Sequence, residues 1–206
     1  MDPRLLDAAR SGDVDLLKKI AEEDADLLRG VTPFRNTALH IAVTFKQQEF
    51  VEEICARKPA LLGERNRNCE TPLHAAAILG SHRAVVFFLG LVAALDVGWV
   101  DMKGLPRAAD RYGNTALHAA LLNGHAEVAQ EMVSADPGLA SYMNEQRESP
   151  LYLAAMRGFL AIVQSAFCNA ISATIEGIAA EPRCTQLLSE GTEVARISLR
   201  RSRTLF

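Results

Sequence analysis

The chain has 206 residues and a formal net charge of −3 at pH 7, and 49% of its residues are hydrophobic while 6% are aromatic. This composition is ordinary for a globular protein and leaves room for one or two domains or one repeat array. The nearly balanced charge excludes a general nucleic-acid binder, which needs a concentrated basic surface. The longest apolar run, residues 84–95, is shorter than the about 20 residues of a transmembrane helix, so no direct membrane insertion is predicted.

The cysteines and the N-terminus bear on the cellular compartment. Cys55, Cys69, Cys168 and Cys184 are spread along the chain without a C-x-x-C pair. The first residues carry no apolar stretch of the kind that marks a secretory signal. We therefore expect reduced, buried thiols and a cytoplasmic protein.

Four copies of one short motif indicate a repeat architecture. They read "NTALHIA" from residue 36, "ETPLHAA" from 70, "NTALHAA" from 114 and "ESPLYLAA" from 148. Their hydroxyl residues, Thr37, Thr71, Thr115 and Ser149, are separated by 34, 44 and 34 residues. A threonine or serine is a good helix N-cap, because its oxygen accepts a hydrogen bond from a free N–H of the first turn. A period in this range is typical of stacked repeats.

Each motif is followed by a turn and a second apolar pattern. Nine positions after the hydroxyl residue stands a glycine, or Lys46 in the first copy. From that point apolar residues recur at offsets 4, 5, 8 and 9, which is one stripe of an α-helix. The stripes are Phe50, Val51, Ile54 and Cys55; Ala84, Val85, Phe88 and Leu89; Val128, Ala129, Met132 and Val133; and Ile162, Val163, Ala166 and Phe167.

The same apolar offsets follow Gly12, which adds one unit before the four motif copies. The sequence therefore predicts an all-α solenoid of about five helix-turn-helix units with projecting β-turn or hairpin loops. The interval between Thr71 and Thr115 is ten residues longer than the others, and we place this insertion at about 92–108 as a protruding loop. The array is predicted to cover residues 1–168, with units near 3–36, 37–70, 71–114, 115–148 and 149–168.

Residues 169–206 fall outside the repeat and are predicted to form a non-repeat tail that is partly helical and partly disordered, or a foreign end from truncation or alternative splicing. A divergent cap is the less favoured interpretation. If this tail does not cap the array, the apolar side of Ile162, Val163 and Phe167 stays open. Such a face would favour self-association through the last repeat, or an additional repeat.

The three histidines at one repeat position are expected to be structural. Equivalent residues of stacked units lie about one helix diameter, roughly 10 Å, apart, so the rings cannot share a metal ion. We expect each ring to bond the hydroxyl of its own motif and the backbone of the next loop, since buried polar groups need partners. No catalytic, metal or cofactor site is predicted, and the chain is predicted not to be an enzyme. The structural motif comprises Thr37, His40, Thr71, His74, Thr115, His118 and Ser149, while Tyr152 takes the histidine position in the last copy.

Partner binding is expected on the concave surface that such arrays present. The residues just before each turn glycine would face it, with loop-tip residues at its edge. Ile78 and Leu79 have an alternative interpretation, in which they fill gaps between adjacent repeats. The predicted partner-binding residues are Phe34, Thr44, Phe45, Arg67, Ile78, Leu79, Tyr112, Leu122, Asn123, Met156 and Arg157.

One loop position is predicted to be strained. Two residues before the hydroxyl residue the turn favours a positive φ, which suits glycine. Gly113 fits, but Arg35, Cys69 and Arg147 occupy this position in the other loops. Those loop tips are expected to be strained or reshaped.

The T-P-L-H-x-A pattern and its period resemble the ankyrin-repeat family. The stretches "VTPFRNTALHIAVTFKQQEFVEEI" and "LLGERNRNCETPLHAAAILG" are similar to plant ankyrin proteins with a C-terminal PGG membrane domain, the accelerated-cell-death type. The resemblance implies a non-catalytic cytosolic adaptor that binds a partner protein, with a role in plant defence or stress signalling. It also allows a location at the cytosolic face of a membrane. The alternative it leaves is a truncated relative of a membrane-anchored signalling protein, acting as a decoy or regulatory fragment.

Overall fold

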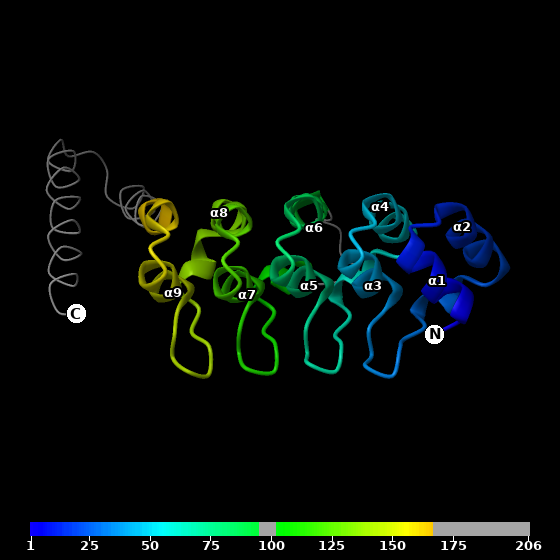
Figure 1. The fold of residues 1–206 in the computed structure, drawn as a ribbon, viewed down its shortest axis with the longest axis horizontal. Coiled ribbons are helices and arrows are strands. Elements are labelled where there is room, and N and C mark those ends of the chain that lie inside the picture. The colour runs from blue at the N-terminus through cyan, green and yellow to red at the C-terminus, as the bar shows by residue number, and fades with distance from the viewer. Residues whose placement is uncertain (95–101, 167–206) are drawn as a thin grey trace, which may run out of the picture. The chain divides into compact units, whose positions relative to one another are not determined.

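The computed structural model describes residues 1–94 and 102–166, which form pairs of antiparallel helices joined by tight turns (Figure 1). The predicted all-α class is confirmed, since within these residues β-pairing is limited to the isolated bridges Val31–Thr37 and Ala109–Thr115. The helix pairs are α1 (Pro3–Ser11) with α2 (Val14–Glu23), α3 (Ala38–Thr44) with α4 (Gln48–Arg57), α5 (Pro72–Ile78) with α6 (His82–Ala94), and α7 (Ala116–Leu122) with α8 (Ala126–Ala135), followed by α9 (Pro150–Met156) and a helical stretch at 160–166.

Capping residues and turns set the helix ends. The Thr37 hydroxyl accepts a hydrogen bond from the His40 N–H at the start of α3, and Ser149 accepts one from the Tyr152 N–H at the start of α9. Asp2 does the same for α1, where the Thr-x-x-His motif is absent. These caps satisfy N–H groups that have no partner inside the helix. After each first helix, one residue with positive φ turns the chain into the second helix.

The core lies between the helix pairs of successive units. First helices pack on first helices (α1 on α3, α3 on α5, α5 on α7, α7 on α9), and α2, α4, α6 and α8 form a second row (Figure 1). Leu39, Leu73 and Leu117 of the first row are fully buried, as are Phe50 and Phe88 of the second. Burying each side chain of this size stabilises the fold by about 1.5–3 kcal/mol. Alanines beside the leucines allow the short first helices to approach closely.

A loop projects before each of the later first helices, and we call these loops finger 1 (residues 32–36), finger 2 (66–70), finger 3 (110–114) and finger 4 (144–148). Each finger is closed by a backbone bond between its end residues, as from Asn66 N to Glu70 O at 2.9 Å. Successive fingers are also joined, by Arg67 N to Phe34 O at 2.9 Å, Arg111 N to Asn68 O at 2.9 Å and Glu145 N to Tyr112 O at 3.1 Å. The fingers therefore form a hydrogen-bonded row.

The finger tips are strained and keep their shape. Arg35, Cys69 and Arg147 have φ values of 60°, 62° and 61°, in the same region as Gly113 at 77°. A residue with a Cβ is disfavoured there by roughly 1–2 kcal/mol. The bonds that close and join the fingers hold these residues in that conformation.

The segment predicted as an inserted loop is helical at both of its ends. We expected a protruding loop over 92–108, but residues 92–94 continue α6 and Met102–Arg107 form the 3-10 helix η3. This helix corresponds to η1 (Ala25–Arg29), η2 (Pro59–Gly63) and η4 (Pro137–Ser141) of the other units. Leu105 of η3 is buried, like Leu139 of η4. The loop prediction is therefore wrong for both ends of the segment, and its middle, 95–101, lies outside the described residues, as does the predicted tail.

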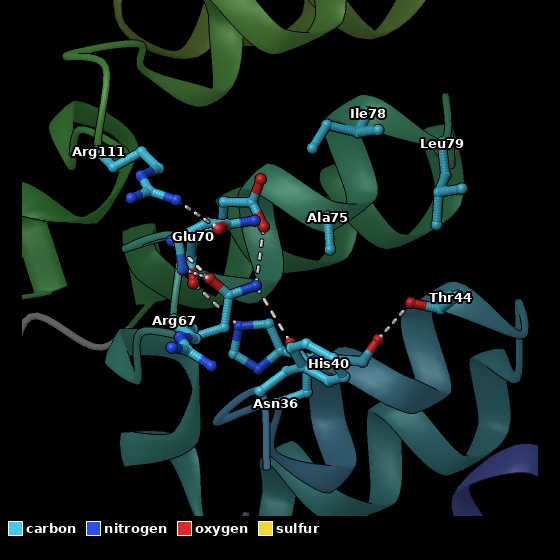
Figure 2. A pocket seen from close by; sticks show the side chains of 12 residues that line it. Asn36, His40, Thr44, Arg67, Glu70, Ala75, Ile78, Leu79 and Arg111 are labelled. Atoms are coloured by element: carbon cyan, nitrogen blue, oxygen red, sulfur yellow. Dashed lines mark hydrogen bonds between the residues drawn. The ribbon is translucent and has the colours of Figure 1, made fainter. Parts of the chain in front are cut away.

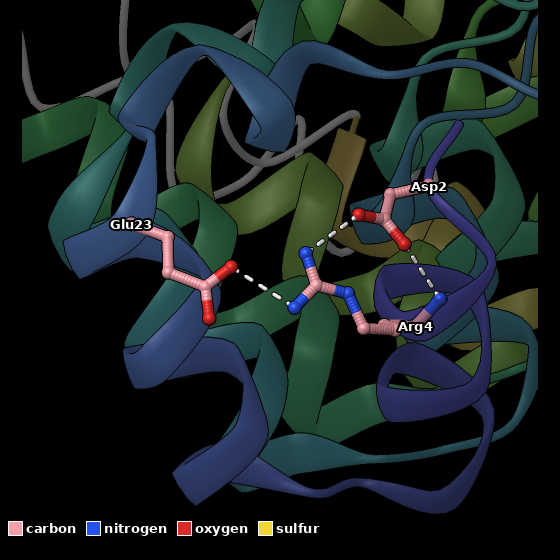
Figure 3. A network of polar contacts seen from close by, with 3 residues as sticks. All are labelled: Asp2, Arg4 and Glu23. Carbon is pink, nitrogen blue, oxygen red and sulfur yellow. Dashed lines mark hydrogen bonds and ion pairs between the residues drawn. The ribbon is translucent and has the colours of Figure 1, made fainter.

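The first helix pair is linked by a charged network at its open end (Figure 3). The Arg4 guanidinium donates to Asp2 at 3.0 Å and to Glu23 at 2.9 Å, which connects the start of α1 to the end of α2. The hydrogen bonds from Arg4 hold the pKa of the Asp2 carboxyl below its ordinary value. All three groups are at the surface, so this network orients the helix ends and adds little to stability.

Two further findings concern the compartment and the membrane. Within the described residues, no helix combines the length and the apolar character that crossing a membrane requires. Cys55 is a buried free thiol whose pKa is raised by burial to about 12. Cys69 is also free but half-buried, at the tip of finger 2, which departs from the expected full burial. Cys168 and Cys184 lie outside the described residues.

Candidate protein-binding groove

Each buried histidine connects two units. His40 Nδ1 lies 2.9 Å from the Thr37 hydroxyl, and His40 Nε2 lies 3.0 Å from the Glu70 carbonyl oxygen of the next finger. A carbonyl oxygen only accepts, so Nε2 carries the proton and Nδ1 accepts from the threonine. The same two contacts recur at 2.9 and 3.1 Å for His74, with Thr71 and Asn114, and at 2.9 and 3.1 Å for His118, with Thr115 and Glu148.

Burial keeps these rings neutral. It lowers the pKa of His40, His74 and His118, and the hydrogen bonds to backbone carbonyls offset this only in part. Because both nitrogens of each ring are bonded, neither is free to take a proton from a substrate. Among the residues that the structure describes, no group of three or more His, Cys, Asp or Glu side chains is arranged to hold a metal ion.

A groove of about 690 Å³ opens between fingers 1 to 3 and helices α3 and α5 (Figure 2). Its two sides differ in chemistry. Arg67 and Arg111 lie on the finger side, whereas Ala75, Ile78 and Leu79 lie on the helix side. The remaining lining residues are Phe34, Asn36, His40, Thr44, Asn66, Asn68 and Glu70.

Five predicted partner-binding residues meet in this groove: Phe34, Thr44, Arg67, Ile78 and Leu79. Phe34 is 65% exposed, while Ile78 and Leu79 are half-buried and pack against the core as well as lining the groove. One part of each of these two side chains lines the groove, as expected for partner binding, while another part packs against the core, as expected for residues that fill gaps between repeats. The Thr44 hydroxyl donates to the His40 carbonyl at 2.8 Å, which fixes its side chain along α3.

The other predicted residues lie on the same row of helices and fingers but do not line this groove. Phe45 is 48% exposed and stacks under the Arg10 guanidinium at 5.8 Å. Tyr112 is exposed at the tip of finger 3, where Arg111 covers its ring at 5.6 Å. Asn123 donates to Ala119 O at 2.8 Å, Arg157 donates to Leu122 O at 2.7 Å, and Leu122 and Met156 are exposed.

Sequence reasoning missed the amide groups of the groove. Asn66 Nδ2 donates to Asn36 Oδ1 at 3.1 Å and to Glu70 Oε2 at 2.7 Å. The same contact joins Asn144 to Asn114 at 2.9 Å between fingers 3 and 4. The signal was present, because an asparagine stands just before Thr37 and again just before Thr115.

Comparison with known proteins agrees with this geometry. The family model described as ankyrin repeats (3 copies) matches residues 5–98 and 91–176. Protein ACCELERATED CELL DEATH 6 of Arabidopsis thaliana is 30% identical over 162 residues, which cover 77% of this chain and 24% of that protein. The chain thus spans about a quarter of the length of this relative, and the resemblance drawn from the sequence motifs is confirmed. Repeated Thr-x-x-His caps, paired helices, projecting fingers and the match over most of the chain together place this protein in the ankyrin-repeat family.

Proposed function

We propose that this chain is a non-catalytic protein-interaction module that holds a partner protein in the groove between fingers 1 to 3 and helices α3 and α5. The observation that carries the proposal is the exposed Phe34 ring, which lines the same groove of about 690 Å³ as Ile78 and Leu79. An aromatic side chain next to apolar surface and arginines is the usual composition of a binding hot spot. The partner surface continues along the array at Phe45, Tyr112, Leu122, Asn123, Met156 and Arg157.

The similarity to Protein ACCELERATED CELL DEATH 6 supports a place for this module in plant defence or stress signalling. In this proposal the chain acts as an adaptor in the cytoplasm, or at the cytosolic face of a membrane through its partner. Two free thiols among the described residues are compatible with a reducing compartment.

Affinity capture with matched variants tests the groove. Phe34→Glu places a charge in the groove, whereas Val86→Glu places the same charge on α6, where Val86 is 43% exposed outside the groove. Both replace an exposed apolar residue, so neither should unfold the chain. The partner set captured by wild type and quantified by mass spectrometry should be lost with Phe34→Glu and retained with Val86→Glu. Equal capture by both variants, with unchanged thermal melting, would rule out the groove as the binding site.

A second candidate is a regulatory fragment that acts as a decoy for a membrane-anchored relative. The observation that favours it is the 30% identity to Protein ACCELERATED CELL DEATH 6 over 77% of this chain, since similar arrays can compete for one partner. In this case the purified chain should displace a partner from the array of the longer relative in a competition assay. A partner that binds only one of the two proteins would exclude the decoy role.

A further inference from the structure

We infer that the groove takes an extended segment of a partner protein in which acidic residues alternate with apolar ones. This inference rests on the proposed function and specifies the partner chemistry. It depends on three properties of the groove: its charge, its two unlike sides and its length.

The charge of the groove favours an acidic partner. Arg67 and Arg111 are exposed on the finger side, and within the described residues the Arg67 guanidinium has no ion-pair partner. The one acidic lining residue, Glu70, already accepts a hydrogen bond from Asn66 at 2.7 Å. Arg35 and Arg65 add exposed positive charge beside the groove. A carboxylate here would meet guanidinium groups that match its geometry.

The surface over α2 and α4 has the opposite charge. These two helices lie on the side of the first helices away from the fingers (Figure 1), and a shallow surface over them is lined by acidic side chains. The chain therefore combines a net charge of −3 with a positive groove. An acidic segment is repelled from one face and attracted to the other, which orients its approach. The acidic residues concerned are Asp13, Asp15, Glu49, Glu52 and Glu53.

The two sides of the groove set the sequence pattern of the bound segment. Arg67 and Arg111 face the groove from the fingers, and Ala75, Ile78 and Leu79 face it from α5 (Figure 2). In an extended chain, successive side chains point in opposite directions. A strand lying along the groove thus directs every second residue to the guanidinium groups and the intervening residues to the apolar side.

The length of the groove suits a short extended segment. From finger 1 to finger 3 there are two repeat spacings, or about 20 Å if each equals a helix diameter. An extended chain covers about 20 Å with about six residues.

Synthetic peptides test this inference with the full chain. Three acetylated peptides of about eight residues serve as probes: alternating aspartate and leucine, the same residues in two separate blocks, and alternating lysine and leucine. Binding is followed by NMR through the side-chain Nε–H signals of Arg67 and Arg111 and the methyl signals of Ile78. We expect the alternating acidic peptide to bind at least about tenfold more tightly than the other two and to weaken as salt screens the charges.

A pair of arginine variants provides the control. Arg67→Glu should weaken the alternating acidic peptide by about tenfold or more, because it puts like charges together. Arg29→Glu makes the same change at an exposed position of η1 outside the groove and should leave the affinity unchanged. Thermal melting confirms that both variants fold.

Equal binding of the lysine peptide or the block peptide, no binding of any peptide, or equal effects of the two variants would each overturn the inference. The proposed function fails separately: it is lost if Phe34→Glu leaves partner capture intact. It survives if capture depends on Phe34 while the captured partner lacks an acidic–apolar segment.

Discussion

The buried imidazoles of His40, His74 and His118 each close a threonine cap in one unit and reach a carbonyl oxygen in the next. A residue type that elsewhere performs acid–base chemistry is here held neutral by burial. This arrangement makes the fold sensitive to acid, since a protonated ring carries a proton on Nδ1 and can no longer accept from the threonine hydroxyl and N–H.

Acid should therefore destabilise the array. The folded-state pKa values lie below the ordinary value of 6.5, so the unfolded chain binds protons first as the pH falls. This stabilisation is fully present above about pH 6.5 and is lost as the pH falls towards the folded-state values. Urea midpoints should decrease from about pH 7.5 to about pH 5.5. His74→Gln should lower stability at neutral pH but make this decrease shallower, and an unchanged slope would contradict the role of the ring.

A second prediction at the residue scale concerns Lys46. It has a φ of 59° at the position where later units have Gly80, Gly124 and Gly158. Lys46→Gly removes a cost of roughly 1–2 kcal/mol but adds backbone entropy to the unfolded chain, at about 0.5–1 kcal/mol. We expect a net gain of about 0.5 kcal/mol in unfolding free energy. Lys19→Gly, within α2, should instead lose about 1 kcal/mol, which gives an opposite sign for the same exchange.

At the scale of elements, the turns between paired helices are also contacts between units. The His125 ring at the start of α8 donates from Nε2 to Ile78 O at 3.0 Å, which places the ring against Gly80. A Cβ built at Gly80 would lie 2.5 Å from His125 Nδ1, whereas one at Gly124 would meet nothing within 4 Å. Gly80 is therefore needed for two reasons. Its positive φ forms the turn, and its lack of a Cβ leaves room for the His125 ring of the next unit.

Matched alanine variants separate these two roles. Gly80→Ala and Gly124→Ala both place a Cβ at positive φ, with φ values of 64° and 83°. Each should lose about 1 kcal/mol from backbone strain. Gly80→Ala should lose about 1–2 kcal/mol more, because the His125 ring must move from Ile78 O. Equal melting temperatures for the two variants would show that the ring adjusts freely.

The sequence predicted the elements better than the site. Apolar spacing and the hydroxyl residues located the helix pairs, because caps and stripes are local. The 3-10 helices η1 to η4 were all missed, although a leucine stands ten residues before each hydroxyl residue, at Leu27, Leu61, Leu105 and Leu139. The groove could be located only in part, because the position of Arg111 beside Arg67 depends on how fingers 2 and 3 pack, which no local pattern encodes.

At the scale of the whole array, each unit contacts mainly its neighbours, since packing among the described helices runs from one pair to the next. Stability in such a structure is close to a sum of unit and interface contributions. A defect in one unit should therefore spread to adjacent units before distant ones.

Leu117→Ala tests this coupling. Leu117 is fully buried in α7, and the cavity should cost about 2–5 kcal/mol. Hydrogen exchange should lose protection in α5 and α9 more than in α1. The control Leu122→Ala, on the exposed side near the end of the same helix, should cost no more than about 0.5 kcal/mol. Equal loss of protection in α1 would indicate a single cooperative core.

The interval from Thr71 to Thr115 is ten residues longer than the others, yet the contact that spans it is unchanged. His74 Nε2 meets Asn114 O at 3.1 Å across this longer stretch of chain, and the uninterrupted units show 3.0 and 3.1 Å. The number of residues between α6 and η3 therefore does not change how the neighbouring units stack. A reporter peptide or an affinity tag inserted between α6 and η3 should therefore leave the spacing of the units unchanged.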